Sequence, residues 1–321
     1  MAYETGVATD VIDLLAKIRG MAVGLGWTID RNEPTELALH HADAGFFTLL
    51  AQPEEDDIQT TDYPRPYIYI WGQTGFDAGA AYNTQPGSSG GRYGRTDALR
   101  GPFAAYHLFG TTQYIHCVVE IVPGEFAHFH FGRLDKSGDY PGGEYATGTN
   151  WRYNLQYANT HNRDSLSPFH AVPFDGLSRH ATGQGVVRLD VPGYTEEWGE
   201  FYDVNSSSFS VAWGPARLGA NTWRSPYTFY WLSTPNTVNA VAPLAPCLVS
   251  FVLRGEKTFL AGAPADLRIV NLRNLTPGET ITIGPDEWLC FPLKKRGLGQ
   301  YGPNYQVNSG LFGLAYRKVL P

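Results

Sequence analysis

Short apolar runs separated by glycine, proline and asparagine turns make up most of this chain and limit what it can fold into. The 321 residues include 36 glycines and 22 prolines, which leaves few stretches long enough for a helix. Within the runs, apolar and polar side chains often alternate, which is the two-residue period of a half-buried strand. The pattern predicts a mainly β protein.

The predicted strands form two groups with a looser region between them. The first group comprises residues 67–71 and an antiparallel meander made of residues 105–109, 114–122 and 127–131. The second group is a compact β unit with strands expected at 248–253, 267–272, 280–283, 288–293 and 311–316. Between the groups, residues 208–213 form one short alternating run.

One segment near the N-terminus has helical spacing instead. Its apolar residues recur at steps of three and four, and they are Val11, Leu14, Leu15, Ile18, Ala22 and Leu25. Asp10 is the expected N-cap, and Gly24 and Gly26 mark the C-terminal end. Because an isolated helix of about 16 residues is marginal in water, we expect Leu14, Leu15 and Ile18 to dock on the β unit or on a neighbouring subunit.

The expected fold is therefore mainly β, with antiparallel meander or sandwich-like units, one N-terminal α-helix and long glycine-rich loops. Residues 1–145 are predicted to form a domain of the helix and antiparallel strands. Residues 146–243 are predicted to be a loop-rich insertion with short strands. Residues 244–321 are predicted to be a C-terminal β unit that packs on the first domain.

Residues 72–95 are the most glycine-rich of the expected loops. Composition of this kind predicts a loop that is mobile in the isolated subunit and is ordered by partners, because its glycines make it costly to fix. Tyr82, Arg92, Tyr93 and Arg95 are residue types favoured at interfaces, and they are the candidate contact residues of this loop.

Charge and hydropathy exclude several classes of partner. The formal net charge is −7 and the longest basic run is Lys294-Lys295-Arg296, so no nucleic-acid partner is expected. No segment approaches the ~20 apolar residues of a membrane-spanning helix, so no membrane partner is expected either. Three widely spaced cysteines, Cys117, Cys247 and Cys290, are expected to be reduced and buried.

The sharpest enzyme-like feature is His128-x-His130, with His116 upstream and Asp135 downstream. Alternate strand residues share a face, so two imidazoles could bind one metal ion. The string resembles the cupin metal motif, although its first glycine is too close to the histidines and Asp135 stands where that family prefers Glu. A metal-dependent β-barrel enzyme is therefore one alternative, and amphipathic packing of the histidines at a sheet surface is the other.

Other catalytic signatures are missing from the chain. There is no G-x-S-x-G elbow, no phosphate-binding G-x-x-x-x-G-K-[ST] loop and no H-E-x-x-H helix. We therefore expect no enzyme and no cofactor. The many aromatic residues in glycine-rich loops could bind sugars, and this leaves a carbohydrate-binding receptor module as a further alternative.

Three segments of the sequence resemble virion structural proteins of tailed bacteriophages. The first is Tyr3-Glu4-Thr5-Gly6 followed by the Leu14-Leu15 helix and Gly26-Trp27-Thr28. The second runs from Gly101-Pro102-Phe103 through His116, Val118-Val119 and His128 to Phe131-Gly132-Arg133-Leu134-Asp135-Lys136 and Gly142-Gly143. The third runs from Leu272-Arg273-Asn274-Leu275 through Trp288 to Gly313-Leu314-Ala315-Tyr316-Arg317-Lys318.

The resemblance implies a subunit of the tail, baseplate or neck with no reaction attached. Its partners would be other virion proteins and copies of itself, and it would be assembled into the virion in the host cytoplasm. An acidic, aromatic-rich β chain with long loops is consistent with a protein that works by contact.

Overall fold

The computed structural model describes residues 2–53, 66–91, 93–96, 99–149, 185–190, 198–200, 209–213, 244–253, 258–295 and 312–318. These residues form one helix and twenty strands, and every strand pairing is antiparallel. The mainly β fold with a single N-terminal helix, predicted from the sequence, is therefore confirmed.

A large central sheet forms the middle layer. Its strands run in the order β1 (Ala2–Gly6), β7 (Ala105–Gly110), β8 (Tyr114–Val122), β9 (Glu125–Lys136), β10 (Gly142–Gly148), β11 (Gly185–Leu189) and β12 (Trp198–Glu200). The far end of β9 also pairs with β16 (Thr258–Pro264), which continues to β15 (Val249–Leu253) and β13 (Phe209–Trp213). The predicted meander is confirmed as β7, β8 and β9.

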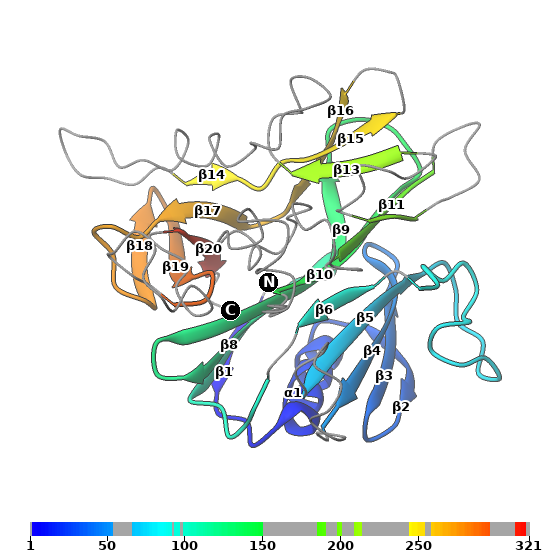
Figure 1. The fold of residues 1–321 in the computed structure, drawn as a ribbon, viewed down its shortest axis with the longest axis horizontal. Coiled ribbons are helices and arrows are strands. Elements are labelled where there is room, and N and C mark those ends of the chain that lie inside the picture. The colour runs from blue at the N-terminus through cyan, green and yellow to red at the C-terminus, as the bar shows by residue number, and fades with distance from the viewer. Residues whose placement is uncertain are drawn as a thin grey trace, which may run out of the picture.

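An N-terminal sheet covers one face of the central sheet, with the helix α1 (Val11–Gly24) in the same layer. The strand order is β2 (Thr28–Asn32), β3 (Glu36–His41), β4 (Gly45–Gln52), β5 (Tyr67–Gln73) and β6 (Gly94–Thr96). Figure 1 shows this sheet and α1 on one side of the diagonal central strands. The first core lies between these layers, and Phe47, Ile70 and Phe129 are among its fully buried members.

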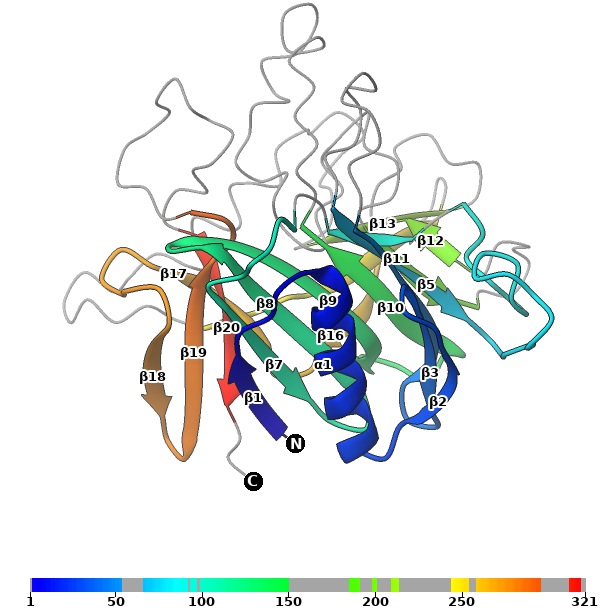
Figure 2. The same cartoon turned by 90° about the horizontal axis from the view of Figure 1, so that it is seen from below.

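A C-terminal sheet covers the opposite face. Its strand order is β14 (Ala245–Pro246), β17 (Leu267–Asn271), β20 (Phe312–Lys318), β19 (Asp286–Pro292) and β18 (Glu279–Ile283). A second core between this sheet and the central sheet contains Phe126, Phe291 and Tyr316. Figure 2 shows β18 as the outermost strand of this sheet, beside β19.

Burial of both faces explains the near-continuous apolar sequence of the central strands. On β8, Ile115 and Val119 belong to the first core, whereas Val118 belongs to the second. On β9, Phe129 faces the first core and Phe126 the second. A strand with one solvated face would instead show polar residues at every other position.

The helix forms where its spacing predicts it. The Asp10 carboxylate accepts hydrogen bonds from the backbone N–H groups of Ile12 (2.9 Å) and Asp13 (2.8 Å), so the predicted N-cap is confirmed. The helix ends at Gly24, where the sequence predicted it to end.

The predicted domain division meets one complication in the structure. The boundary proposed at residue 145 lies inside β10, and β16 of the proposed C-terminal unit pairs with β9 of the proposed first domain. Residues 146–243 are described only in part, and β11, β12 and β13 from that range join the central sheet. That this range is an insertion stays a prediction.

Candidate functional site

The three candidate histidines come together between the central and C-terminal sheets. His116 lies on β8 and His128 and His130 lie on β9, with their side chains fully buried. The ring centroids of His116 and His130 are 5.0 Å apart, and those of His128 and His130 are 6.4 Å apart. The prediction that His128 and His130 share one face of a strand is confirmed.

His128 uses both ring nitrogens to join the two sheets. Its Nε2 lies 2.7 Å from the carbonyl oxygen of Pro292 on β19, and its Nδ1 lies 2.7 Å from the hydroxyl of Tyr316 on β20. A carbonyl can only accept, so Nε2 carries the proton and Nδ1 accepts from the Tyr316 O–H. His128 therefore has no lone pair left for a metal ion unless the bond to Tyr316 breaks.

His116 makes a similar contact one strand away. Its Nε2 lies 2.9 Å from the carbonyl oxygen of Ala265, so it also donates to backbone. The ring of Tyr114 stacks on it at 4.1 Å, and the Tyr114 hydroxyl donates to a carboxylate oxygen of Asp266 at 2.8 Å. Arg317 on β20 pairs with the other oxygen of Asp266 at 3.2 Å. The turn after β16 is therefore bonded to the central sheet through Tyr114 and to the C-terminal sheet through Arg317.

Burial keeps these imidazoles neutral. It lowers the pKa of His116 and of His128 from 6.5 to about 4, because the charged ring would lose its hydration. The pKa of His130 is lowered well below 6.5 by the same burial, and its histidine neighbours lower it further. The neutral rings of His116 and His128, each hydrogen-bonded to a backbone carbonyl, act as packing groups.

Asp135 does not join the histidines. It is exposed, and its carboxylate accepts a hydrogen bond of 2.9 Å from Gln113 Nε2. Within the described ranges, no three His, Cys, Asp or Glu side chains are arranged to hold a metal ion together. The four-residue metal site considered from the sequence is therefore not assembled, because Asp135 projects elsewhere and His128 is engaged by protein groups.

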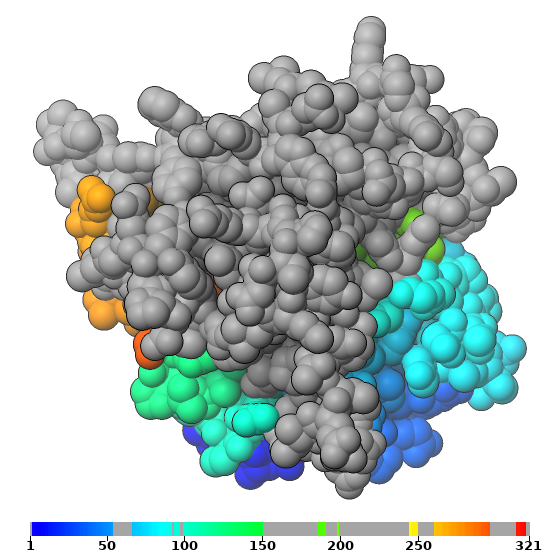
Figure 3. Space-filling model, in the orientation of Figure 1, coloured from blue at the N-terminus to red at the C-terminus, as the bar shows by residue number. Residues whose placement is uncertain are grey.

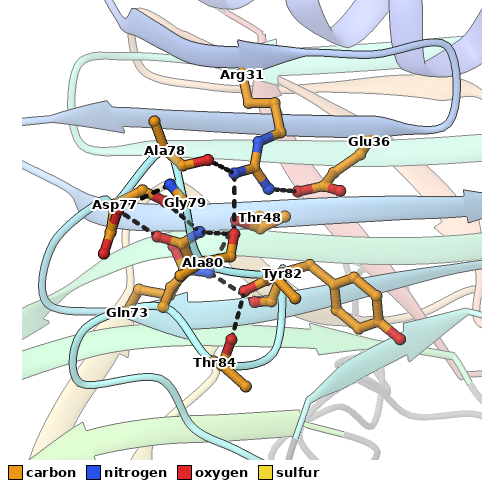
Figure 4. A network of polar contacts seen from close by, with 12 residues as sticks. Arg31, Glu36, Thr48, Gln73, Asp77, Ala78, Gly79, Ala80, Tyr82 and Thr84 are labelled. Carbon is orange, nitrogen blue, oxygen red and sulfur yellow. Dashed lines mark hydrogen bonds and ion pairs between the residues drawn. The ribbon is translucent and has the colours of Figure 1, made fainter.

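Residues 74–91 form an ordered cover over the outer face of the N-terminal sheet, as Figure 4 shows. Arg31 on β2 donates from Nη2 to the carbonyl oxygens of Ala78 and Ala80, both at 2.9 Å, and pairs with Glu36 at 2.6 Å. Gln73, at the end of β5, donates from Nε2 to the carbonyl oxygen of Tyr82 in the loop at 3.0 Å. Side chains of the sheet thus fix the loop from below.

Gln85 fixes the same loop from within. Its Nε2 donates to the carbonyl oxygens of Asp77 and Ala80, both at 2.9 Å, and its Oε1 accepts from the Asp77 N–H at 2.7 Å. The Trp198 indole on β12 donates to the carbonyl oxygen of Gly87 at 2.8 Å. The expectation of a loop without order in the isolated chain does not agree with these contacts.

The loop's candidate interface residues differ in accessibility. Arg95 is 1% exposed, with its guanidinium 5.0 Å from the ring centroid of Tyr67 and 5.2 Å from that of Tyr69. β6 places Arg95 against this aromatic row, and its role at an interface stays a prediction. Tyr82 and Tyr93 are half-buried and pack against Trp71 at 4.6 and 5.4 Å, and Arg92 lies outside the described residues.

The helix residues proposed for an interface are also buried. Leu14, Leu15 and Ile18 are at most 3% exposed and belong to the first core. Docking on the chain's own β unit, one of the two expectations, is what the structure has. These three side chains offer no surface to a neighbouring subunit.

Sequence reasoning missed two residues that make several hydrogen bonds or ring contacts. Tyr316 and Gln85 sit in ordinary strand and loop sequence, and their partners lie far away or in irregular backbone. The cysteines were easier to predict, since Cys117, Cys247 and Cys290 are free and buried as expected.

Neither a protein-family model nor a curated protein matches this sequence. Among the described residues, no helix has the length and apolar character needed to cross a membrane. The interpretation of the site therefore rests on its own geometry.

Proposed function

We propose that this chain is a structural subunit of a tailed-phage virion, located in the tail, baseplate or neck. It acts through contacts with other virion proteins and with copies of itself, and it catalyses no reaction. The three segments that resemble such proteins motivate the proposal.

The observation that carries it is the role of the residues in the second of those segments. His116 and His128 are buried packing groups between two sheets. A Cβ at Gly132 would lie 2.4 Å from the carbonyl oxygen of Gln113, and one at Gly142 would lie 2.5 Å from that of Arg188. Both glycines have a positive φ, so other residues would strain the backbone there.

Glu144, which follows the glycine pair, is also structural. It is 3% exposed and pairs with Arg133 at 2.7 Å and with Arg188 at 3.4 Å, which joins β9, β10 and β11. The residues of this segment thus serve the fold, which supports a protein that works by assembly.

The test is detection of the chain in purified virions by mass spectrometry, followed by disruption of its gene in the phage genome. We expect stoichiometric amounts in wild-type particles, and incomplete or unstable tails without the gene. Complete, infectious tails that lack the protein would overturn the proposal.

A further inference from the structure

Among the residues that the structure describes, β18 is an edge strand of ordinary length with open side chains. It is the last strand of the C-terminal sheet, and four of its five residues are exposed, Ile283 by 46%. All of residues 280–283 are β-branched, and the pairing with β19 is regular, without a bulge. An edge of this kind is a template for another strand.

Five other edge strands of the described sheets are shielded in some way. β2 has an irregular register between Ile29 and Arg31, and Arg31 is tied down by the loop. β14 has two residues, one of which is Pro246, and β6 and β12 have three residues each. β1 is half-buried along most of its length. These are the means by which proteins block edge pairing, and β18 has none of them.

We infer that β18 pairs with the β18 of a second copy of this chain, antiparallel about a two-fold axis at Ile281. In this register Ile281 faces its own copy, Thr280 faces Thr282 of the other chain, and Glu279 faces Ile283. No like charges meet, and β-branched residues face each other at the three central positions. The strand is thus complementary to itself, as an isologous interface requires.

The same register also makes the outer faces of the two sheets continuous. Ile281 lies opposite Trp288 on β19. It is partly buried against the apolar cluster to which Trp288 belongs. Pairing therefore sets two Ile–Trp pairs side by side and closes both open edges. Figure 3 shows orange atoms of the C-terminal sheet at the margin of the molecule.

The inference deepens the proposed function by naming a self-contact, but its test uses the isolated chain. If β18 does not pair, the chain can still be detected in virions, so the proposed function would stand. If the chain is not detected in virions, the isolated chain can still pair through β18. A five-residue strand pair buries less than the roughly 1,000 Å² of a stable interface, so the isolated dimer is weak and is best trapped covalently.

The first test compares Ile281→Cys with Ile283→Cys under mild oxidation by oxidised glutathione. Opposite residues in an antiparallel pair have Cα atoms about 4.5–5.5 Å apart, within disulfide range, whereas position 283 would lie about 14 Å from its own copy. The native cysteines are buried, so the unsubstituted chain gives the background level of disulfide dimer. We expect a disulfide dimer from Ile281→Cys only. The proposed register would be overturned by equal amounts of dimer from both variants. It would also be overturned if Ile281→Cys formed no dimer.

A second test uses the exposed positions, where a substitution leaves the core intact. Thr280→Lys with Thr282→Lys puts like charges opposite each other, whereas Thr280→Glu with Thr282→Lys puts opposite charges there. We expect the second variant to self-associate about tenfold more strongly in sedimentation equilibrium at low salt. Equal association of the two variants would overturn the two-fold pairing.

Discussion

His128 lies where two sheets meet, and its two hydrogen bonds explain why a histidine serves there. The ring donates to Pro292 and accepts from Tyr316, so one side chain satisfies a strand carbonyl and a buried hydroxyl. The sequence could predict that His128 and His130 share a face, because that follows from the two-residue period. It could not predict Tyr316 as a partner, since that residue is 188 positions away.

The buried imidazoles make stability depend on pH. The pKa of His116 and His128 is about 4 in the folded chain and about 6.5 in the unfolded chain, so the unfolded state binds more protons between these values. Stability is therefore full above pH 6.5 and is lost as the pH falls toward 4, by roughly 2 kcal/mol per histidine at pH 5.

Urea unfolding at pH 7, 6 and 5 measures this loss. The variant His128→Gln should be less stable at pH 7, because it disrupts the contacts to Pro292 and Tyr316, but its stability should fall less steeply with pH. An unchanged pH slope in the variant would show that His128 does not contribute to it.

At the scale of elements, the loop of residues 74–91 is the clearest departure from the sequence prediction. Its glycine content does raise the entropic cost of order, as expected. Composition does not reveal what offsets that cost, which here is a set of hydrogen bonds from Arg31, Gln73 and Gln85 to loop carbonyls. The strands of the meander were predictable because their pattern is local, whereas this cover depends on contacts between elements.

Removal of the Gln85 side chain should loosen this cover. Gln85→Ala loses three hydrogen bonds at a position that is 3% exposed, so we expect faster proteolytic cleavage within residues 74–91 of the isolated chain. The control is Asn83→Ala at an exposed position of the same loop, which should leave the cleavage rate unchanged. Equal rates for both variants would mean that Gln85 does not hold the loop.

At the scale of the whole molecule, the central sheet couples two cores that lie on its opposite faces. Cys117 is buried in the first core and Cys247 in the second. The rate at which a reagent labels each thiol therefore measures how often that core opens. The sequence predicted buried cysteines and a layered β fold. It could not show which sheet lies in the middle, because that depends on strand pairs such as β9 with β16.

A cavity in the first core should therefore destabilise the second. Leu15→Ala should cost about 2–5 kcal/mol, because the side chain is 3% exposed. If the layers unfold together, thiol labelling followed by mass spectrometry should accelerate equally at Cys117 and Cys247. Val23→Ala on the exposed side of the helix is the matched control, and acceleration at Cys117 alone would mean that the cores open separately.

The position of β20 has a consequence for synthesis on the ribosome. This strand lies between β17 and β19, although it follows both in the chain. During translation β19 has a partner on only one side until residues 312–318 leave the exit tunnel, and the apolar side chains of Leu289 and Phe291 stay uncovered by Tyr316. A nascent chain stalled before residue 312 would therefore carry an unfinished sheet, and such a chain is a natural client for chaperones that bind exposed strands.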